Sequence, residues 1–396
     1  MKHAEGAGQR GPRRSTGRAD CDLLIAGGGP VGAAVALGLR GIGLDVALVE
    51  ADAKPRPEFR PIALAYGSRQ ILERLGVFGR FAATPIETIH VSQAGGFGRT
   101  VIRREDHGVP ALGYVCDAGA LAEVLAEAAA PERVAGRVVG WRADGEGLRV
   151  TVDTGSGAHE VAARLLVLAD GGQIGGDDLA MRDYGQAAIV ARVRTEIVRP
   201  GTAWERFTDA GPLALLPDED ATSALVWTVR AAEAPRLLEA SGERFLASLG
   251  ARFGQRLGRF VATGPRSSFP LRLVFRRSNV AGPRTVAVGN AAQALHPVAG
   301  QGLNLGLRDA IELGALVRRT APGALGGERF LAEYRARRRV DRFAAIGVTN
   351  FLAGVFADRS PPLRAARGLG LVALDLLPPA RRLFARRMML GLRGAP

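Results

Sequence analysis

The chain has 396 residues, of which 47% are hydrophobic and 23% are charged, and it contains 53 glycines and 22 prolines. This composition predicts a globular protein with more than one domain, and it excludes a disordered chain, a collagen-like repeat and a simple coiled coil. All but two of the 53 basic residues are arginines, and the formal net charge is +14. The arginines are scattered without interleaved aromatic residues, which disfavours nucleic-acid binding and leaves a genomic bias or an affinity for anionic lipids and cofactors open.

The N-terminal segment 1–20 is rich in glycine and arginine and lacks apolar periodicity, so it is expected to be a disordered leader. It has no long apolar core of a secretory signal, and two cysteines are too few for a disulfide framework. We therefore expect a cytoplasmic protein, although the leader's arginines keep a mitochondrial protein open. The uncharged apolar stretch 23–39 is interrupted by five glycines and a proline, so no transmembrane helix is predicted.

The folded part is expected to begin at Cys21 with a β-α-β unit. An apolar run at 22–26, a helical pattern at 30–41 and a second apolar run at 45–50 have the spacing of such a unit. This is the opening of a doubly wound parallel sheet.

A glycine-rich turn joins the first expected strand to the helix. Gly27, Gly29 and Gly32 satisfy the pattern G-x-G-x-x-G, and Glu50 ends the next strand. The glycines allow a tight turn, the approach of a pyrophosphate to the backbone, and close packing of helix on strand, while the acid can bind an adenosine ribose. The motif predicts dinucleotide binding and leaves NAD and FAD open.

The middle of the chain has a different pattern. Apolar runs at 188–194 and 224–230 are expected to be half-buried strands, separated by a turn around Gly211–Pro212 and followed by a helix near 239–252. They predict a second domain with an antiparallel sheet, inserted into the first.

Two further apolar runs flank this block, at 165–169 and 285–288. Each ends in a polar, glycine-containing turn, so both are expected to be parallel strands whose carboxyl ends face one site. From Gly302 onward the pattern is mostly helical.

The second glycine-rich cluster, at 286–293 and 296–309, decides between the two dinucleotides. Its first turn can place Asn290 on a ribitol or ribose hydroxyl, and a helix is expected to start near Gly302. A helix N-terminus directed at the pyrimidine edge of an isoalloxazine stabilises the negative charge that forms on reduction. The cluster therefore favours FAD.

From about residue 22 to 392 the chain resembles the flavin-dependent aromatic hydroxylases of the p-hydroxybenzoate hydroxylase fold, in their ubiquinone-biosynthesis branch. The matching segments occur in the order of that branch: 60–64, 112–115, 170–171, 184–190, 205–208, 211–217, 226–228 and 269–271. Most of the family has Gly-Asp and Ala-Ala-His in the second FAD motif, whereas Gly289-Asn290 and Ala291-Ala292-Gln293 resemble the 2-octaprenyl-6-methoxyphenol hydroxylases.

The resemblance implies an α/β fold with a Rossmann-like, doubly wound FAD-binding domain, an α+β substrate domain with an inserted antiparallel sheet, and a helical C-terminal region. The FAD-binding domain is expected at 21–82, 111–175 and 276–335. The substrate domain is expected at 83–110 and 176–275, and the helical region at 336–396.

The resemblance also implies the site residues. The ADP half of FAD is expected on Gly27, Gly29, Gly32 and Glu50, with Arg60 reaching towards the cofactor and Asp170 beside it; the riboflavin half is expected on Gly289, Asn290, Gly300, Gly302 and Asn304. The backbone of His296 and Pro297 is expected beside the flavin, near the place where oxygen adds, with a structural role for His296 favoured over proton transfer. No metal site is expected.

By the same resemblance, NAD(P)H reduces FAD in a transient encounter, O2 gives a flavin hydroperoxide, and the ring of a polyprenylated phenol is hydroxylated in ubiquinone biosynthesis. After Asp170-Gly171, however, the family's Ser and Arg are replaced by 172–177. A specialised electron donor, a tolerated deletion and a weakened enzyme are the three explanations left open.

The C-terminal segment 343–391 mixes apolar runs with arginines, which fits either an amphipathic helix packed on the domain or a basic surface resting on the inner membrane. Peripheral membrane contact is an expectation of the second interpretation, and a place in a ubiquinone-biosynthesis complex is a separate expectation. Two other functions stay open: a hydroxylase of a small soluble aromatic compound, and a non-catalytic flavoprotein or assembly subunit.

Overall fold

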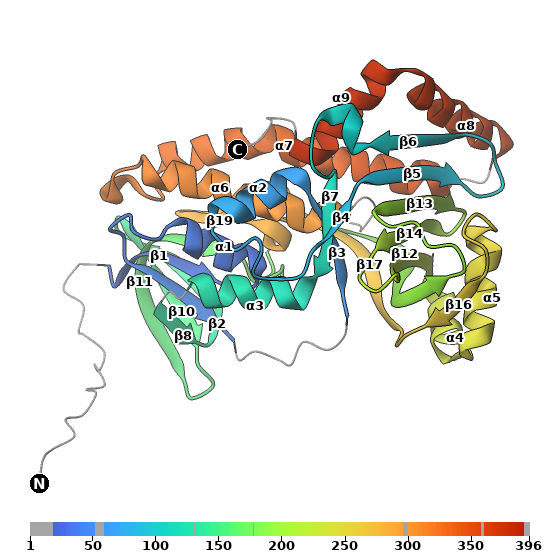
Figure 1. The fold of residues 1–396 in the computed structure, drawn as a ribbon. Helices are drawn as coiled ribbons and strands as arrows, with labels where there is room; N and C mark the ends of the chain where they lie inside the picture. Colours follow the sequence, from blue (N-terminus) through green and yellow to red (C-terminus); the bar gives the residue numbers. More distant parts are fainter. Residues whose placement is uncertain are drawn as a thin grey trace, which may run out of the picture.

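The computed structural model describes residues 19–51, 59–129, 132–176, 178–295, 300–357 and 360–391. Nearly all of the expected leader therefore lies outside the described residues. The two cysteines, Cys21 and Cys116, are both buried and unbridged. Figure 1 shows an eight-stranded sheet at one end, a nine-stranded sheet at the other, and a small three-stranded sheet between them.

The eight-stranded sheet contains the predicted β-α-β unit, formed by β1 (Cys21–Ala26), α1 (Pro30–Gly38) and β2 (Val46–Glu50). Its strand order is β18-β19-β11-β1-β2-β8, and β1 lies parallel to both β2 and β11, as β11 does to β19. The carboxyl ends of these strands therefore share one edge, as predicted. The remaining strands are β8 (Glu132–Ala135), β9 (Arg137–Asp144), β10 (Gly147–Asp153), β11 (Ala158–Leu168), β18 (Val280–Gly282) and β19 (Thr285–Ala287).

Both faces of this sheet are buried, because successive side chains of a strand point to opposite sides. Leu23 and Ile25 pack into a core with the helices α1, α3 and α6, whereas Leu24 and Ala26 pack into a core that the hairpin of β9 and β10 closes. The covering helices are α3 (Ala118–Ala129), α6 (Gln301–Arg318) and α7 (Glu328–Ala357).

The nine-stranded sheet has the order β20-β17-β12-β15-β14-β13-β5-β6, with β16 paired to β12. It is mixed and not purely antiparallel as expected, since β5 and β13 pair in parallel. Gly211 and Pro212 open strand β14, and the turn falls just before them. The strands are β5 (Thr88–Gln93), β6 (Arg99–Arg103), β12 (Leu179–Thr195), β13 (Thr202–Thr208), β14 (Gly211–Pro217), β15 (Ser223–Arg230), β16 (Phe260–Thr263), β17 (Ser267–Arg276) and β20 (Gln293–Ala294).

One face of the nine-stranded sheet packs against α4 (Ala234–Glu239) and α5 (Gly242–Phe253), where Trp227, Phe245 and Leu249 form a buried core. The other face is turned towards the three-stranded sheet of β3 (Pro61–Ala65), β4 (Thr84–Ile86) and β7 (Gly113–Asp117), with α2 (Tyr66–Arg74) beside it. The space between these layers is where the site lies.

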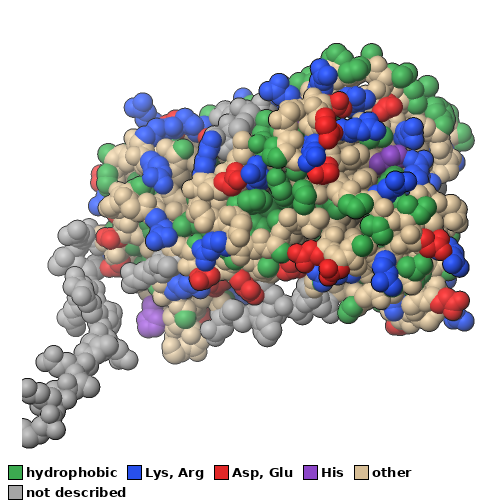
Figure 2. Space-filling model, in the orientation of Figure 1, with side chains coloured by type: hydrophobic (Ala, Val, Ile, Leu, Met, Phe, Trp, Pro, Cys, Tyr) green, Lys and Arg blue, Asp and Glu red, His purple; other side chains and the backbone are tan. Residues whose placement is uncertain are grey.

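The C-terminal helices α8 (Pro361–Leu376) and α9 (Pro378–Leu390) pack on β6 and on α2 respectively. They leave large apolar side chains exposed, among them Leu369, Leu376 and Leu383. Figure 2 shows hydrophobic side chains gathered at this end of the visible face, with arginines nearby. None of the described helices combines the length and apolar content that crossing a bilayer requires.

Candidate functional site

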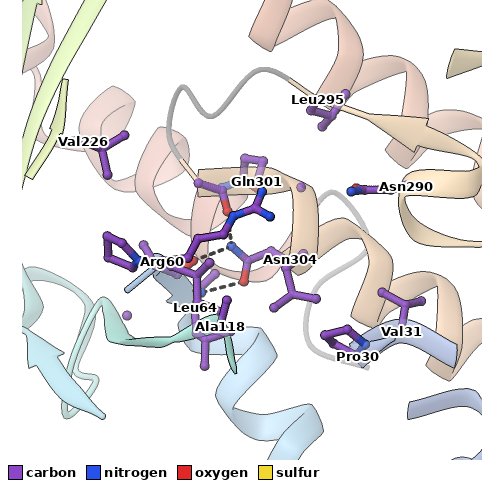
Figure 3. Close-up of a pocket in the computed structure, with 18 of the residues that line it drawn as sticks. Pro30, Val31, Arg60, Leu64, Ala118, Val226, Asn290, Leu295, Gln301 and Asn304 are labelled. Atoms are coloured by element: carbon purple, nitrogen blue, oxygen red, sulfur yellow. Dashed lines mark hydrogen bonds between the residues drawn. The ribbon is translucent and has the colours of Figure 1, made fainter. Parts of the chain in front are cut away.

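One cavity of about 1800 Å³ runs from the glycine-rich turn after β1 to the inner face of the nine-stranded sheet. In Figure 3, Pro30 and Val31 lie on one side of it and Val226 on the other, with Arg60 and Asn304 between them. Pockets for a single small ligand have volumes of roughly 300–1,000 Å³. The cavity therefore has room for a dinucleotide and a second ligand.

The glycines of the first motif have two different roles: Gly27 and Gly32 allow close backbone packing, whereas Gly29 leaves space for a ligand. A Cβ on Gly32 would lie 2.0 Å from the carbonyl oxygen of Gly27, and one on Gly27, whose φ is +110°, would lie 2.6 Å from that of Ala169. A Cβ on Gly29 would meet no protein atom within 4 Å. Gly29 is also the N-cap of α1 and makes no side-chain cap, so free N–H groups of this helix N-terminus face the cavity. This arrangement fits a pyrophosphate.

Glu50 ends β2 at the same edge and lines the cavity. Its Oε2 lies 3.4 Å from Nη1 of Arg133, and a Cβ on Gly28 would come within 2.3 Å of the carboxylate. The position, one strand away from the glycine turn, suits the ribose contact that the sequence predicts.

The second motif forms the opposite wall of the cofactor region. Gly289 opens a short 3-10 turn at φ +56°, and Asn290 follows it at the cavity. Gly300, at φ +60°, is the N-cap of α6, and a Cβ on Gly302 would meet nothing within 4 Å. A second helix N-terminus without a side-chain cap therefore opens onto the cavity, which fits the pyrimidine edge of a flavin.

Asn304 acts on the backbone around the cavity. Its Oδ1 accepts a hydrogen bond from the N–H of Ala65 (2.8 Å), and its Nδ2 donates to the carbonyls of Ala63 (2.9 Å) and Gly300 (2.7 Å) (Figure 3). The residue is only 2% exposed, and its side chain joins β3 to the start of α6. It therefore positions two walls of the cofactor region.

The altered segment after Asp170 is anchored at both ends. The carboxylate of Asp170 accepts from the N–H groups of Gly172 (3.4 Å) and Ile174. Arg276 donates through Nη2 to the carbonyl of Ile174 (2.9 Å), and its Nη1 pairs with Asp178 at 2.5 Å. These contacts hold the replaced segment against the cavity, which it lines.

The remaining predicted positions are Arg60, His296 and Pro297. Arg60 lines the cavity, and its guanidinium carbon lies 5.1 Å from the centre of the Phe269 ring. His296 and Pro297 lie outside the described residues. Among the residues that the structure does describe, no group of three or more His, Cys, Asp or Glu side chains could hold a metal ion.

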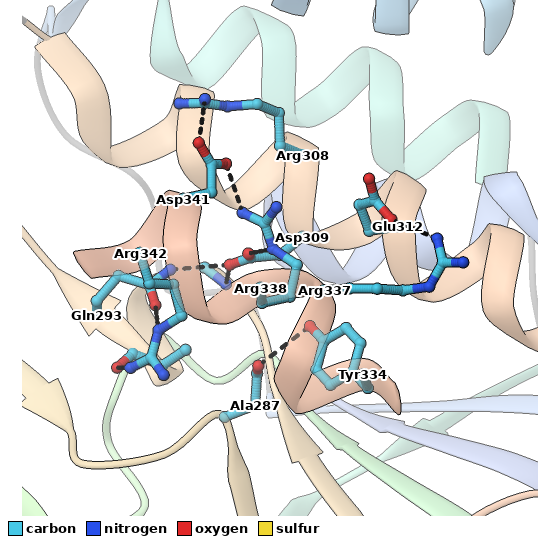
Figure 4. Close-up of polar contacts among 12 residues, drawn as sticks. Ala287, Gln293, Arg308, Asp309, Glu312, Tyr334, Arg337, Arg338, Asp341 and Arg342 are labelled. Atoms are coloured by element: carbon cyan, nitrogen blue, oxygen red, sulfur yellow. Dashed lines mark hydrogen bonds and ion pairs between the residues drawn. The ribbon is translucent and has the colours of Figure 1, made fainter. Parts of the chain in front are cut away.

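Behind the second motif lies a buried group of charged and amide side chains that the sequence did not predict. We call it the ionic network, and it consists of Gln293, Arg308, Asp309, Arg338, Asp341 and Arg342 (Figure 4). In the sequence, the run around 335–342 has the pattern of a solvated basic helix face. The one sequence signal for buried ion pairs is the single aspartate, Asp341, among these arginines.

Asp309 is the centre of the ionic network. Its Oδ1 pairs with Nε of Arg338 at 2.6 Å, and its Oδ2 accepts from the backbone N–H of Gly289 (3.0 Å) and from Nε2 of Gln293 (2.8 Å). Arg342 donates in turn to Oε1 of Gln293 at 2.7 Å. The network thus fixes the glycine turn that carries Asn290.

Asp341 extends the network by pairing with Arg338 (3.0 Å) and Arg308 (3.0 Å). Burial by itself lowers the pKa of Arg338, but the neighbouring Asp309 and Asp341 outweigh it and raise that pKa. Arg338 therefore stays charged in the protein interior because its counterions are present.

The far wall of the cavity is the inner face of the nine-stranded sheet. We call it the sheet wall, and its side chains are Ile89, Val91, Thr100, Ile102, Ala203, Glu205, Phe207, Pro212, Ala214, Leu216, Val226 and Thr228. Nine of the twelve are apolar, and the buried hydroxyl groups of Thr100 and Thr228 have no hydrogen-bond partner among the described residues. Burial raises the pKa of Glu205 to about 7.

Comparisons with known proteins show the family to which the chain belongs. Residues 20–345 match the family model described as an FAD binding domain. Ubiquinone hydroxylase UbiL of Rhodospirillum rubrum is 34% identical over 407 residues, covering 96% of this chain and 92% of the relative. The 3-demethoxyubiquinol 3-hydroxylase of Escherichia coli is 31% identical over 384 residues, covering 89% and 94%.

Solved structures of low identity share the fold. The p-nitrophenol 4-monooxygenase PnpA of Pseudomonas putida superposes with a TM-score of 0.72 at 16% identity, covering 92% of this chain and 96% of that structure. HpxO of Klebsiella pneumoniae, solved with FAD and uric acid, has a TM-score of 0.71 at 16% identity and covers 92% and 97%. The predicted fold class is therefore confirmed.

Proposed function

Because this chain belongs to the FAD-binding family and is a flavin-dependent hydroxylase of the ubiquinone pathway, we propose that it hydroxylates the aromatic ring of a polyprenylated phenol. One oxygen atom of O2 enters the ring and the other leaves as water, with two electrons supplied by NAD(P)H. The bound FAD supplies the activation of O2. The protein holds the ring, excludes water and stabilises charge at the cofactor.

The observation that supports this proposal is the continuity of the cavity. The same space touches both glycine motifs, the sheet wall and the helices α8 and α9. In such a space, a ring lying on the sheet wall is within reach of a cofactor held by the two helix N-termini. The apolar lining keeps water from the reacting atoms.

The helical end of the cavity supports the proposed substrate class. Side chains of the last three helices form an apolar lining there: Phe351, Val355, Leu363, Leu371, Leu374, Phe384 and Met388. An isoprenoid tail is apolar and long, and burial of such a chain is favourable by about 0.8 kcal/mol per CH₂. This lining supports a prenylated phenol over a small soluble aromatic acid.

We propose that the exposed apolar side chains of α8 and α9 rest on the cytoplasmic face of a membrane. Leu369, Leu376 and Leu383 are 57–72% exposed, and Arg382, Arg386 and Arg387 lie on α9. Apolar side chains with arginines beside them bind an anionic bilayer surface. A lipid-soluble substrate would enter the cavity from that side.

The test uses the FAD-loaded protein, reduced chemically and then mixed with O2 and 2-farnesylphenol, with 4-hydroxybenzoate as the matched control. Chemical reduction bypasses the donor site next to the altered segment. We expect a hydroxylated farnesylphenol and, with the control, only hydrogen peroxide.

Hydroxylation of 4-hydroxybenzoate alone would favour the small-aromatic alternative. Stoichiometric peroxide with both phenols would favour the non-catalytic flavoprotein. Repeating the reaction with NADH and NADPH in place of the chemical reductant then identifies the donor.

A further inference from the structure

The central row of the sheet wall crosses five strands. Direct cross-strand neighbours point to the same face of a sheet, and the register places Glu205 between Val91 and Ala214, with Thr100 and Val226 at the ends of the row. Trp204 and Arg206, its neighbours along β13, belong to the opposite alternation. Glu205 is therefore the single carboxyl group among the described side chains of the sheet wall.

Nothing in the described part of the chain binds this carboxyl group. It has no hydrogen bond and no ion pair, and burial is the sole cause of its raised pKa. The other described charged residues that line the cavity are Glu50, Arg60, Arg137, Asp170 and Arg367, and none of them contributes to that shift. A charged group in an apolar wall is costly unless a partner is supplied.

We propose that Glu205 receives the phenolic hydroxyl group of the substrate and accepts its proton during hydroxylation. This inference rests on the proposed function and adds the residue that orients the ring. A phenol is an apolar ring with one strong donor, so the ring fits the apolar rows of the wall while the hydroxyl finds an acceptor at their centre.

The proton step balances within the substrate. As the phenolic proton passes to the Glu205 carboxylate, the oxygen lone pair moves into the ring, and the ring carbon ortho or para to it forms its bond to the incoming oxygen atom. The O–O bond of that atom breaks at the same time, and its electron pair leaves with the second oxygen atom, which becomes water. The proton on that carbon is then lost to solvent, and Glu205 returns its proton to the phenolic oxygen as the ring becomes aromatic again. Proton transfer by a positioned side chain contributes roughly 10²–10⁴-fold to a rate.

The first experiment compares the wild-type protein with Glu205→Gln in single turnovers of 2-farnesylphenol across pH. We expect the wild-type rate to fall as the pH drops below about 7, because protonated Glu205 cannot accept a proton. Glutamine still accepts a hydrogen bond but takes no proton, so the variant should bind the phenol, lose roughly 10²-fold or more in rate and show no acidic limb.

The matched control is Glu219→Gln, the same exchange at an exposed position after β14. It should keep both the rate and the acidic limb. If Glu205→Gln also keeps them while wild type makes product, the inference is wrong and the proposed function stands.

The second experiment needs no turnover. Binding of 2-farnesylphenol and of its methyl ether to the oxidised flavoprotein is titrated through the flavin absorbance, in wild type and in Glu205→Leu. Wild type should prefer the phenol at least tenfold, because the ether has no proton to donate, and the variant should lose that preference. This binding preference tests the inference even if the wild-type protein hydroxylates no phenol. Loss of the preference for the phenol in Glu205→Leu supports the role of Glu205, and an unchanged preference contradicts it.

Discussion

Two regions of the molecule differ in how their carboxylates are partnered. In the ionic network, both oxygens of Asp309 and both of Asp341 receive donors from the chain itself. On the sheet wall, Glu205 has no donor among the described residues. A buried polar group that the protein satisfies stabilises the fold, and one that it leaves unsatisfied is available to a ligand.

The largest expected effect comes from breaking the ionic network. Asp309→Ala leaves Arg338 without its nearest counterion and Gly289 without the acceptor of its N–H group. Removal of one partner from a buried pair costs roughly 3–5 kcal/mol. Urea unfolding should show this loss, and the purified variant should retain little FAD.

The control for that variant is Glu312→Gln, which removes one of the two carboxylate partners of Arg337 on the same two helices and leaves Glu333 in place. The Arg337–Glu312 pair is 29% and 21% exposed, so it should contribute no more than about 1 kcal/mol. Equal losses in the two variants would contradict the assignment of Asp309 as the centre of the network.

Replacement of Glu205 should stabilise the protein, whereas replacement of Asp309 should destabilise it. Its pKa is 4.5 when unfolded and about 7 when folded, so the unfolded state ionises first, and stability falls as the pH rises from 4.5 to 7. Glu205→Gln removes that fall and should stabilise the ligand-free protein at pH 8 by roughly 1–2 kcal/mol, less than the whole shift would give, because the half-buried carboxyl faces the cavity. Thermal melts of both proteins at pH 4.5 and 8 measure this difference. No gain at pH 8 would show that a partner or water already stabilises the carboxylate.

Asn304→Leu tests the clamp between β3 and α6. The substitution leaves the N–H of Ala65 and the carbonyls of Ala63 and Gly300 without their partner. Unsatisfied buried groups of this kind cost roughly 1–3 kcal/mol. We expect a lower melting temperature with weaker FAD binding. A variant with unchanged FAD affinity would limit Asn304 to a packing role.

The smallest effect on stability is expected at Gly29, where a Cβ meets no protein atom and φ is −62°. Gly29→Ala should change the unfolding free energy of the apoprotein by less than about 0.5 kcal/mol, yet weaken FAD binding at least tenfold, since the methyl group occupies the path of the pyrophosphate. Gly32→Ala, which clashes with the backbone of Gly27, should instead destabilise the apoprotein. Isothermal titration calorimetry with FAD measures the affinity of both variants and distinguishes loss of binding from loss of stability. If Gly29→Ala binds FAD with unchanged affinity, the pyrophosphate does not lie next to Gly29.

Short-range patterns were sufficient for the fold class and for the β-α-β unit. The strand, the glycine turn and the helix at 21–38 lie within a few residues of one another, so turn geometry and apolar period determine them locally. The strand at 285–287 and the helix that follows Gly300 were predicted for the same reason. The turn expected around Gly211–Pro212 lies directly before these residues, at 209–210, because pairing of β14 with β13 extends the strand over them.

The sequence by itself therefore determined the class of fold, the two glycine motifs and the preference for FAD, since each depends on residues close together in the chain. Only the tertiary structure decided that Asp309 binds the N–H of Gly289 and pairs with Arg338, that Asn304 joins two walls of the cavity, and that β5 lies parallel to β13. It also placed Glu205 opposite Val91, more than a hundred residues earlier in the chain. Such partners are chosen by packing and by the need to satisfy buried polar groups, which no local pattern records.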